Sequence, residues 1–292
     1  MPEGRIIKGV GGRYSVYVYE EEKIYTCQAC GRFRAIGVKP LVGDTAEISI
    51  TNQDEGYILE LAERKNEIIR PRCANIDIIA AVFPAAKPEG SLAMLDTFLI
   101  FASKQTPNAE IVICITKCEL NPVAELMRKI YAPAGYAVFE TSAVNKSFDG
   151  LETALAGKTS VFAGQSGTGK SSLINALCGL SLETNTLSRK IERGRHTTRH
   201  TELFPAPFAE KTFIADAPGF SSFSYNDIKK QDLAYFFPET RPFLNSCVYT
   251  DCAHITEDGC AVKENVGTVI HETRYERYKQ FYYEIAKGKQ IR

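Results

Sequence analysis

Residues 164–171, Gly-Gln-Ser-Gly-Thr-Gly-Lys-Ser, match the pattern G-x-x-x-x-G-K-[ST], whose chemistry is the binding of phosphate groups. An apolar strand-like stretch precedes them and a helix-like stretch follows, which is the context that this motif requires. Glycines let the backbone wrap around phosphates with its N–H groups pointing inward, at the positive end of a helix. The Lys170 ammonium would reach the β- and γ-phosphates as a catalytic cation, and the Ser171 hydroxyl would ligate Mg²⁺. The expected nucleotide contacts are Gly164, Gln165, Ser166, Gly167, Thr168, Gly169, Lys170, Ser171 and Ser172.

Two further loops predict which base is bound. Thr116-Lys117-Cys-Glu119 ends an apolar stretch and is similar to the [NT]-K-x-D pattern of GTP-binding proteins. The acid of that pattern accepts hydrogen bonds from N1–H and the 2-amino group of guanine, a donor pair that adenine lacks. Glu119 replaces the usual Asp, and its longer side chain still reaches both donors. Ser142 and Ala143 follow the next strand-like stretch, where their backbone would read guanine O6. Together the two loops favour GTP over ATP.

A third loop, Asp216-Ala-Pro-Gly219, also follows an apolar stretch. The Asp216 carboxylate would hold Mg²⁺ through water, and the Gly219 N–H would contact the γ-phosphate. In this chain the base-reading loops precede the phosphate loop, which reverses the order of ordinary GTPases. A circular permutation explains the reversal, because joining the old ends and opening the chain elsewhere leaves the site unchanged. The domain then ends just after Gly219, which predicts that nucleotide binding repositions the segment that follows.

Residues 189–199 carry five basic side chains and one acidic one. A solvated loop and an RNA-facing loop both fit this composition, and the position between two nucleotide motifs favours a switch segment. Thr197 or Thr198 would complete the Mg²⁺ shell in the GTP state. Phe220 stands where many GTPases carry the glutamine that orients the attacking water, which predicts slow intrinsic hydrolysis. His196 or a partner would then position the water, and His196 is the candidate catalytic residue.

The cluster Cys247-x4-Cys252-x-His254-x5-Cys260 places three thiols and one imidazole within fourteen residues. Four soft ligands at short spacing fit one closed, tetrahedral Zn²⁺ site with a structural role. The surrounding segment is rich in turn residues, so the metal would replace a core too small to form alone. The pair Cys27-x2-Cys30 lacks two further ligands and reads as part of a hairpin.

Composition excludes several classes of protein. The 292 residues carry 35 basic and 35 acidic side chains and are 44% apolar, which argues against disordered and fibrous classes. No apolar run approaches the ~18–20 residues that cross a bilayer, and the first residues show no apolar signal core. The nine cysteines therefore read as reduced thiols or metal ligands of a cytoplasmic protein. Balanced charge argues against indiscriminate coating of nucleic acid, so any RNA contact is expected to be local.

Three domains are expected to carry these motifs. Residues 1–66 show short alternating strands between glycines, which predicts a small antiparallel barrel, OB-like or SH3-like. Residues 67–224 alternate apolar strands with helices, which predicts an α/β domain with a mostly parallel sheet covered on both faces. Ligands of such sheets bind beyond the carboxyl ends of the strands, where the motif loops fall. Residues 225–292 hold the metal cluster and a terminal helix over residues 268–287.

This order of a strand-rich barrel, a permuted GTPase and a Cys-Cys-His-Cys zinc module resembles the bacterial ribosome small-subunit-dependent GTPase A family. The resemblance covers essentially the whole chain, and residues 194–198 (Gly-Arg-His-Thr-Thr) and 216–220 (Asp-Ala-Pro-Gly-Phe) are among its most specific elements. It implies an OB-fold amino-terminal domain, GTP hydrolysis stimulated by the 30S subunit, and a role in late 30S maturation. It also implies that Phe220 fills the position of the usual glutamine and that a catalytic switch histidine maps onto His196. Glu119 departs from the family's usual Asp.

We therefore expect a monomeric cytoplasmic GTPase that binds GTP and GDP, the 30S subunit and 16S rRNA, and no membrane. Two alternatives remain open. One is a signalling GTPase that docks a protein partner through its barrel, which would lack salt-sensitive binding to rRNA. The other is a GTP sensor with little hydrolysis, because Phe220 cannot orient water.

Overall fold

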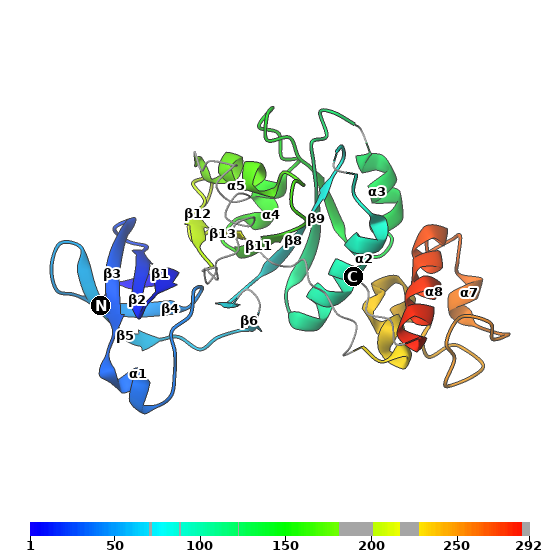
Figure 1. Cartoon of the computed structure of the whole chain (residues 1–292), viewed down its shortest axis with the longest axis horizontal. Helices are drawn as coiled ribbons and strands as arrows, with labels where there is room; N and C mark the ends of the chain where they lie inside the picture. The colour runs from blue at the N-terminus through cyan, green and yellow to red at the C-terminus, as the bar shows by residue number, and fades with distance from the viewer. Residues whose placement is uncertain (70–71, 88, 122, 181–200, 217–227, 288–292) are drawn as a thin grey trace. The chain divides into compact units, whose positions relative to one another are not determined.

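The computed structural model describes the chain except for residues 70–71, 88, 122, 181–200, 217–227 and 288–292 (Figure 1). The chain forms two compact units. The first unit consists of Met1–Val82, Asn108–Glu110 and Gly150–Phe220, and the second consists of Phe83–Pro107, Ile111–Asp149 and Ser221–Arg292. Among the described residues, no helix is both long enough and apolar enough to span a membrane.

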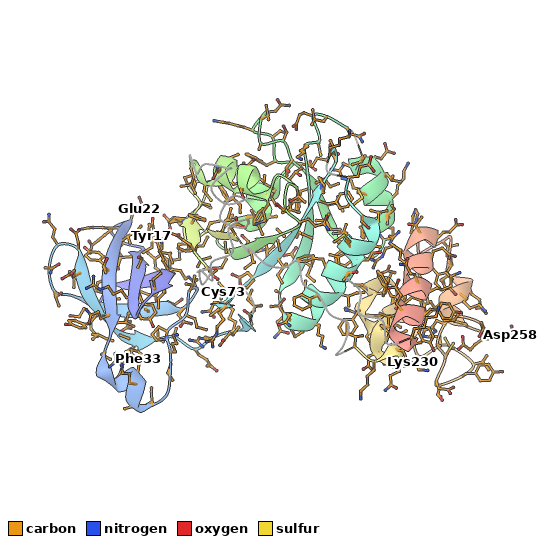
Figure 2. The ribbon with its side chains drawn as sticks, in the orientation of Figure 1. Tyr17, Glu22, Phe33, Cys73, Lys230 and Asp258 are labelled. Carbon is orange, nitrogen blue, oxygen red and sulfur yellow. The ribbon has the colours of Figure 1, made fainter. Side chains whose placement is uncertain are left out.

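The amino-terminal part of the first unit is a closed five-stranded barrel in the order β1-β2-β3-β5-β4. Its elements are β1 (Glu3–Val10), β2 (Arg13–Val18), β3 (Lys23–Ala29), α1 (Gly31–Ala35), β4 (Thr45–Ile50) and β5 (Glu55–Leu61). Alternate side chains of β2, namely Tyr14, Val16 and Val18, are buried, as the period of two along a strand requires. Phe33 of α1 belongs to the same core (Figure 2). The predicted barrel is confirmed, but it is not wholly antiparallel as expected, because β3 and β5 pair in parallel.

A six-stranded sheet has the order β10-β9-β8-β11-β13-β12. Its strands are β8 (Ile78–Pro84), β9 (Glu110–Thr116), β10 (Ala137–Glu140), β11 (Thr159–Ala163), β12 (Leu203–Pro205) and β13 (Phe213–Asp216). Every residue of β8 and β11 is buried, as expected of central strands covered on both faces. Only the edge strand β12 is antiparallel to its neighbour among the pairings described. A two-stranded hairpin, β6 (Glu67–Ile69) with β7 (Arg72–Ala74), precedes β8.

Four helices follow strands of this sheet along the chain: α2 (Leu92–Gln105), α3 (Ala124–Tyr131), α4 (Leu151–Leu155) and α5 (Lys170–Cys178). Helix α2 begins after Ser91, whose hydroxyl caps it by accepting a hydrogen bond from the Met94 N–H at 3.4 Å. The α/β domain with a mostly parallel sheet is therefore confirmed, and its motif loops follow strands β9, β10, β11 and β13.

The carboxy-terminal segment folds into short turns and one long helix. Its elements are the 3₁₀ helices η2 (Lys230–Phe236) and η3 (Pro238–Phe243) and the helices α7 (Ala261–Glu264) and α8 (Glu272–Ala286). Helix α8 begins four residues later than predicted, because the Asn265 carbonyl accepts the N–H groups of Thr268, Val269 and Ile270 in a turn. The His271 side chain then caps the helix by accepting the Thr273 N–H at 3.2 Å.

A buried network of charges joins α8 to α2 and η3 inside the second unit. The Asp96 carboxylate, which has no exposed surface, accepts hydrogen bonds from Tyr131 Oη at 2.7 Å and Arg274 Nη1 at 2.6 Å. It also pairs with Arg277 Nε. Arg274 is 1% exposed and makes two further bonds to Glu239, at 2.6 and 3.1 Å. Each charge loses its hydration on burial, and these ion pairs and hydrogen bonds compensate for that loss.

Candidate functional site

The loop after β11 has the backbone of a phosphate-binding loop. Gly167 and Gly169 have φ values of +82° and +90°, a left-handed conformation that glycine adopts without steric cost. A Cβ atom on Gly164 would lie 2.6 Å from the Val82 carbonyl oxygen, so this position also requires glycine. The Thr168 hydroxyl donates to the Gln165 carbonyl at 3.0 Å and tightens the turn. Helix α5 then begins at Lys170, with its N-terminus at the end of the loop.

The predicted phosphate-binding lysine and the predicted Mg²⁺ aspartate lie together in the first unit. Lys170 Nζ forms an ion pair with the carboxylate of Asp216, the last residue of β13. Both side chains are mostly buried, at 12% and 13% exposure. Burial lowers the pKa of the Lys170 ammonium to about 8, and the adjacent carboxylate favours its charged form at neutral pH. The other predicted switch residues, His196, Thr197, Thr198, Gly219 and Phe220, lie outside the described residues.

The first base-reading loop leaves the end of β9 in a strained conformation. Lys117 has φ of +61°, which is uncommon for a residue with a side chain. Its ammonium donates to the Lys87 carbonyl at 2.6 Å, and the Ala85 N–H donates to the Thr116 carbonyl at 2.8 Å. These bonds hold the loop against the end of β8. The Glu119 side chain is exposed, as a residue that binds a base must be.

The second base-reading loop is tied to the first. The Thr141 N–H and hydroxyl both donate to the Ile115 carbonyl, at 2.7 and 2.9 Å, and the Cys118 N–H donates to the Thr141 carbonyl at 3.4 Å. Ser142 and Ser147 exchange backbone hydrogen bonds of 2.8 and 3.1 Å. The two loops predicted to bind guanine are therefore brought together in the second unit.

The four predicted zinc ligands also lie together in the second unit. One ligand atom from each of Cys247, Cys252, His254 and Cys260 lies within 4.8 Å of the others. The Cys247 and Cys260 sulfurs are 3.9 Å apart, and His254 Nδ1 is 3.5 and 3.4 Å from them. Tetrahedral Zn²⁺ with Zn–S bonds of about 2.3 Å places sulfurs roughly 3.8 Å apart, so the residues fit this metal.

Two domain models of one protein family match the chain. A model of the RsgA GTPase domain matches residues 61–226, and a model of the RsgA N-terminal domain matches residues 3–58. The chain belongs to the RsgA family of GTPases. The resemblance drawn from its motifs is thereby confirmed.

Similar proteins span the chain from end to end. Small ribosomal subunit biogenesis GTPase RsgA 2 of Listeria monocytogenes is 41% identical over 99% of both chains. Small ribosomal subunit biogenesis GTPase RsgA of Bacillus cytotoxicus is 44% identical over 99% of both. Among solved structures, YloQ, described as a circularly permuted GTPase, is 37% identical with a TM-score of 0.76, over 100% of this chain and 97% of YloQ. YjeQ from Thermotoga maritima is 31% identical with a TM-score of 0.78, over 98% of both. The predicted permutation and GTPase activity agree with these relatives.

Glu257 organises the loop of the candidate metal cluster in this RsgA-family chain, a role that its sequence context does not reveal. Its carboxylate accepts the backbone N–H groups of Ala253, Ile255 and Thr256 at 2.9, 2.9 and 3.0 Å. Burial alone would raise the pKa of Glu257, but these hydrogen bonds outweigh it and hold the pKa to about 2. The loop that carries His254 is therefore folded around a charged side chain. A glutamate three residues after a metal ligand is too common a pattern to reveal this role.

Burial favours the neutral forms of both the Cys252 thiol and the His254 imidazole. Burial raises the pKa of the Cys252 thiol to about 12 and lowers the pKa of His254. The neutral imidazole is already the form that binds Zn²⁺, whereas the thiols must lose their protons on binding. Tyr275 and Tyr278 of α8 donate to the carbonyls of His254 and Ala253, each at 2.8 Å. The metal cluster is thus anchored to the terminal helix.

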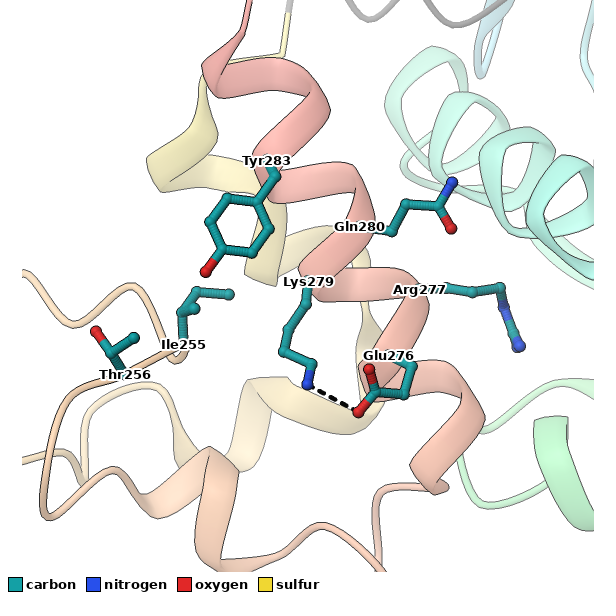
Figure 3. Close-up of a pocket in the computed structure, with 7 residues that line it drawn as sticks. All are labelled: Ile255, Thr256, Glu276, Arg277, Lys279, Gln280 and Tyr283. Carbon is teal, nitrogen blue, oxygen red and sulfur yellow. Dashed lines mark ion pairs between the residues drawn. The ribbon is translucent and has the colours of Figure 1, made fainter.

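A shallow pocket lies between this metal-cluster loop and α8 (Figure 3). Its lining consists of Ile255, Thr256, Glu276, Arg277, Lys279, Gln280 and Tyr283. Lys279 and Glu276, both on the α8 side of the pocket, form an ion pair at 2.8 Å along that helix. None of the described motif residues for phosphate and base lines this pocket.

Proposed function

We propose that this protein hydrolyses GTP during biogenesis of the small ribosomal subunit, with the 30S subunit as the partner that stimulates hydrolysis. The observation that carries the proposal is the pairing of Lys170 with Asp216 at the mouth of a phosphate-binding loop. The printed names of the full-length relatives, small ribosomal subunit biogenesis GTPases, support the choice of partner. A role late in 30S maturation belongs to the same proposal.

The nucleotide contacts in this proposal follow the motif residues. The phosphates would be bound by residues 164–172 and Gly219, and guanine by Thr116, Lys117, Glu119, Ser142 and Ala143. The backbone N–H groups of the phosphate loop and the α5 N-terminus would bind phosphate oxygens. Glu119 would accept from N1–H and the 2-amino group of guanine. The match between the Glu119 carboxylate and these two guanine donors supports GTP as substrate.

Hydrolysis would depend on charge stabilisation and on the position of the water. The Lys170 ammonium would neutralise charge that develops on the β–γ bridging and γ-phosphoryl oxygens. Mg²⁺, held by Ser171, by Thr197 or Thr198, and by Asp216 through water, would neutralise further phosphate charge. Phe220 has no group that orients water, so we assign that task to His196 or to the 30S subunit. Intrinsic hydrolysis should therefore be slow.

We propose three domains for this function, with boundaries at residues 1–66, 67–224 and 225–292. The barrel, with its surface tyrosine and arginine side chains, would contact 16S rRNA. Equal numbers of basic and acidic residues, 35 of each, favour docking to a shaped ribosomal site over binding to free RNA. The protein would act as a cytoplasmic monomer. The basic residues 189–199 would supply a local RNA contact.

The test is GTP turnover by the purified chain with and without 30S subunits. We expect 30S subunits to raise the rate at least tenfold, because the partner completes the position of the water. Equal amounts of 50S subunits and of protein-free 16S rRNA serve as controls and should leave the rate near its intrinsic value. An unchanged rate with 30S subunits would contradict the proposal. If a single turnover of bound GTP remains slow in the presence of 30S subunits, the result would favour a GTP sensor.

We further propose that the Cys247, Cys252, His254 and Cys260 cluster holds one structural Zn²⁺. Bound Zn²⁺ would link its four ligands and stabilise a segment in which every described helix except α8 is short. With no open position, the metal would have no part in hydrolysis.

Elemental analysis should find about one Zn²⁺ per chain after gel filtration, as a closed four-ligand site implies. Cys260→Ser should abolish the bound metal and lower the melting temperature of the second unit. Cys30→Ser, which removes a cysteine outside the cluster, is the matched control and should retain the metal. A zinc content well below one in the unaltered protein, or equal in both variants, would count against the site.

A further inference from the structure

Arg128 of α3 contacts two carboxylates that lie at the two ends of the second base-reading loop. Its Nη1 donates to Glu140 Oε1 at 2.5 Å, and its Nη2 pairs with Asp149 Oδ2 at the same distance. Glu140 is the last residue of β10, and Asp149 comes two residues before α4. The guanidinium therefore joins the strand that enters the loop to the segment that leaves it.

The loop between these carboxylates, residues 141–148, is closed by its own hydrogen bonds. Asp149 Oδ2 also accepts the Glu140 N–H at 3.3 Å, so both ends meet at one point. Within the loop, the Ser142 hydroxyl accepts the Asn145 N–H at 3.1 Å, and Ser142 pairs with Ser147. Arg128 is the cation that joins the two ends of this closed loop.

We propose that Arg128 is a positioning residue for guanine recognition, which fixes the direction of the backbone N–H group of Ala143, while the Ser142 N–H donates to the Ser147 carbonyl. The inference rests on the proposed function, because the Ala143 N–H belongs to the backbone assigned to guanine O6. Arg128 itself would contact neither base nor phosphate. A hydrogen bond weakens steeply as its angle opens, so a small rotation of the loop would reduce binding of O6 specifically.

The two ion pairs of Arg128 contribute little to stability. The three side chains are 39%, 39% and 45% exposed, and ion pairs this exposed are screened by water and contribute little. Replacing Arg128 should therefore leave the fold intact while releasing the loop. This separation of stability from binding makes the role measurable. Lys129, its neighbour on α3, pairs with Glu125 within the helix and provides a control of equal charge.

The test compares the affinities of the full-length protein for three diphosphates by isothermal titration. GDP has both O6 and the 2-amino group, inosine diphosphate retains O6 alone, and 2-aminopurine riboside diphosphate retains the amino group alone. We expect Arg128→Ala to weaken GDP and inosine diphosphate roughly five- to tenfold, the range of one lost hydrogen bond. Binding of 2-aminopurine riboside diphosphate should change less than about twofold, since it has no O6 to lose.

Two further variants complete the design. Arg128→Lys retains one cation and should recover part of the preference for O6, whereas Lys129→Ala should match the unaltered protein. Equal weakening of all three nucleotides by Arg128→Ala, or no weakening of any, would overturn the positioning role. Failure of the proposed function has a different signature: the unaltered protein itself would bind GDP no better than ADP. A thermal melt of each variant verifies that it is folded.

Discussion

Replacing Lys170 by alanine should lower the affinity for GTP and GDP by about a hundredfold or more. The ammonium is held at the start of α5 beside Asp216 and is 12% exposed, so it is already placed and partly dehydrated for phosphate. Hydrogen bonds to charged groups contribute about 1.5–3 kcal/mol each, and loss of one or two accounts for the factor. Removal also leaves the Asp216 carboxylate as an uncompensated negative charge beside incoming phosphates. Titration calorimetry with each nucleotide measures the effect.

Lys158→Ala provides the matched control for Lys170→Ala. Lys158 lies in the same unit, pairs with Glu110 at 3.1 Å and is 38% exposed. The Lys158→Ala substitution therefore removes one lysine without altering the phosphate loop. Nucleotide affinity should stay within about twofold, since exposed pairs contribute little. Unaltered affinity in Lys170→Ala would refute the assignment of the phosphate loop.

Replacing Asp96 by alanine should destabilise the second unit by about 3–5 kcal/mol, the cost of breaking a buried ion pair from one side. Asp96 accepts from Tyr131, Arg274 and Arg277, and its loss leaves the Arg277 guanidinium buried without its carboxylate. Arg274 keeps Glu239, so the effect falls on the contact between α2 and α8.

Hydrogen exchange measured by mass spectrometry locates this effect, because it reports the opening free energy of each segment. Amides of α8 and α2 should exchange much faster in Asp96→Ala, whereas amides of the barrel should not change. Glu125→Ala is the control, since its carboxylate is 80% exposed and pairs with Lys129 alone in the described structure. Equal protection of α8 in Asp96→Ala and the unaltered protein would show that the network does not stabilise this contact.

The features that could be predicted from sequence are those whose chemistry depends on neighbouring residues. Gly167 and Gly169 mark positions where the backbone must be left-handed, so the phosphate loop is visible as a spacing of glycines. The four proposed zinc ligands lie within fourteen residues, a spacing short enough for one small loop to surround an ion. The order of the motifs likewise reveals the permutation, since each motif identifies its own strand end.

Features that depend on distant residues left no such pattern. Asp96 and Arg274 look like ordinary surface charges in sequence, because nothing near either residue shows that its partner is buried beside it. Arg128 is equally inconspicuous, since its role depends on where β10 and α4 place two carboxylates. The start of α8 was predicted too early because the turn at Asn265 competes with the helix for the same N–H groups.

The separation of 178 residues between Asp96 and Arg274 has a consequence for synthesis of the protein. At about 5–20 residues per second, a ribosome needs on the order of ten to forty seconds to extend the chain from one to the other. During that time the Asp96 carboxylate lacks its ion-pair partners Arg274 and Arg277, so α2 cannot be buried as it is in the finished molecule. The barrel, whose strands all come from the first 61 residues, is under no such constraint. Folding of the second unit therefore waits until α8 has emerged from the exit tunnel.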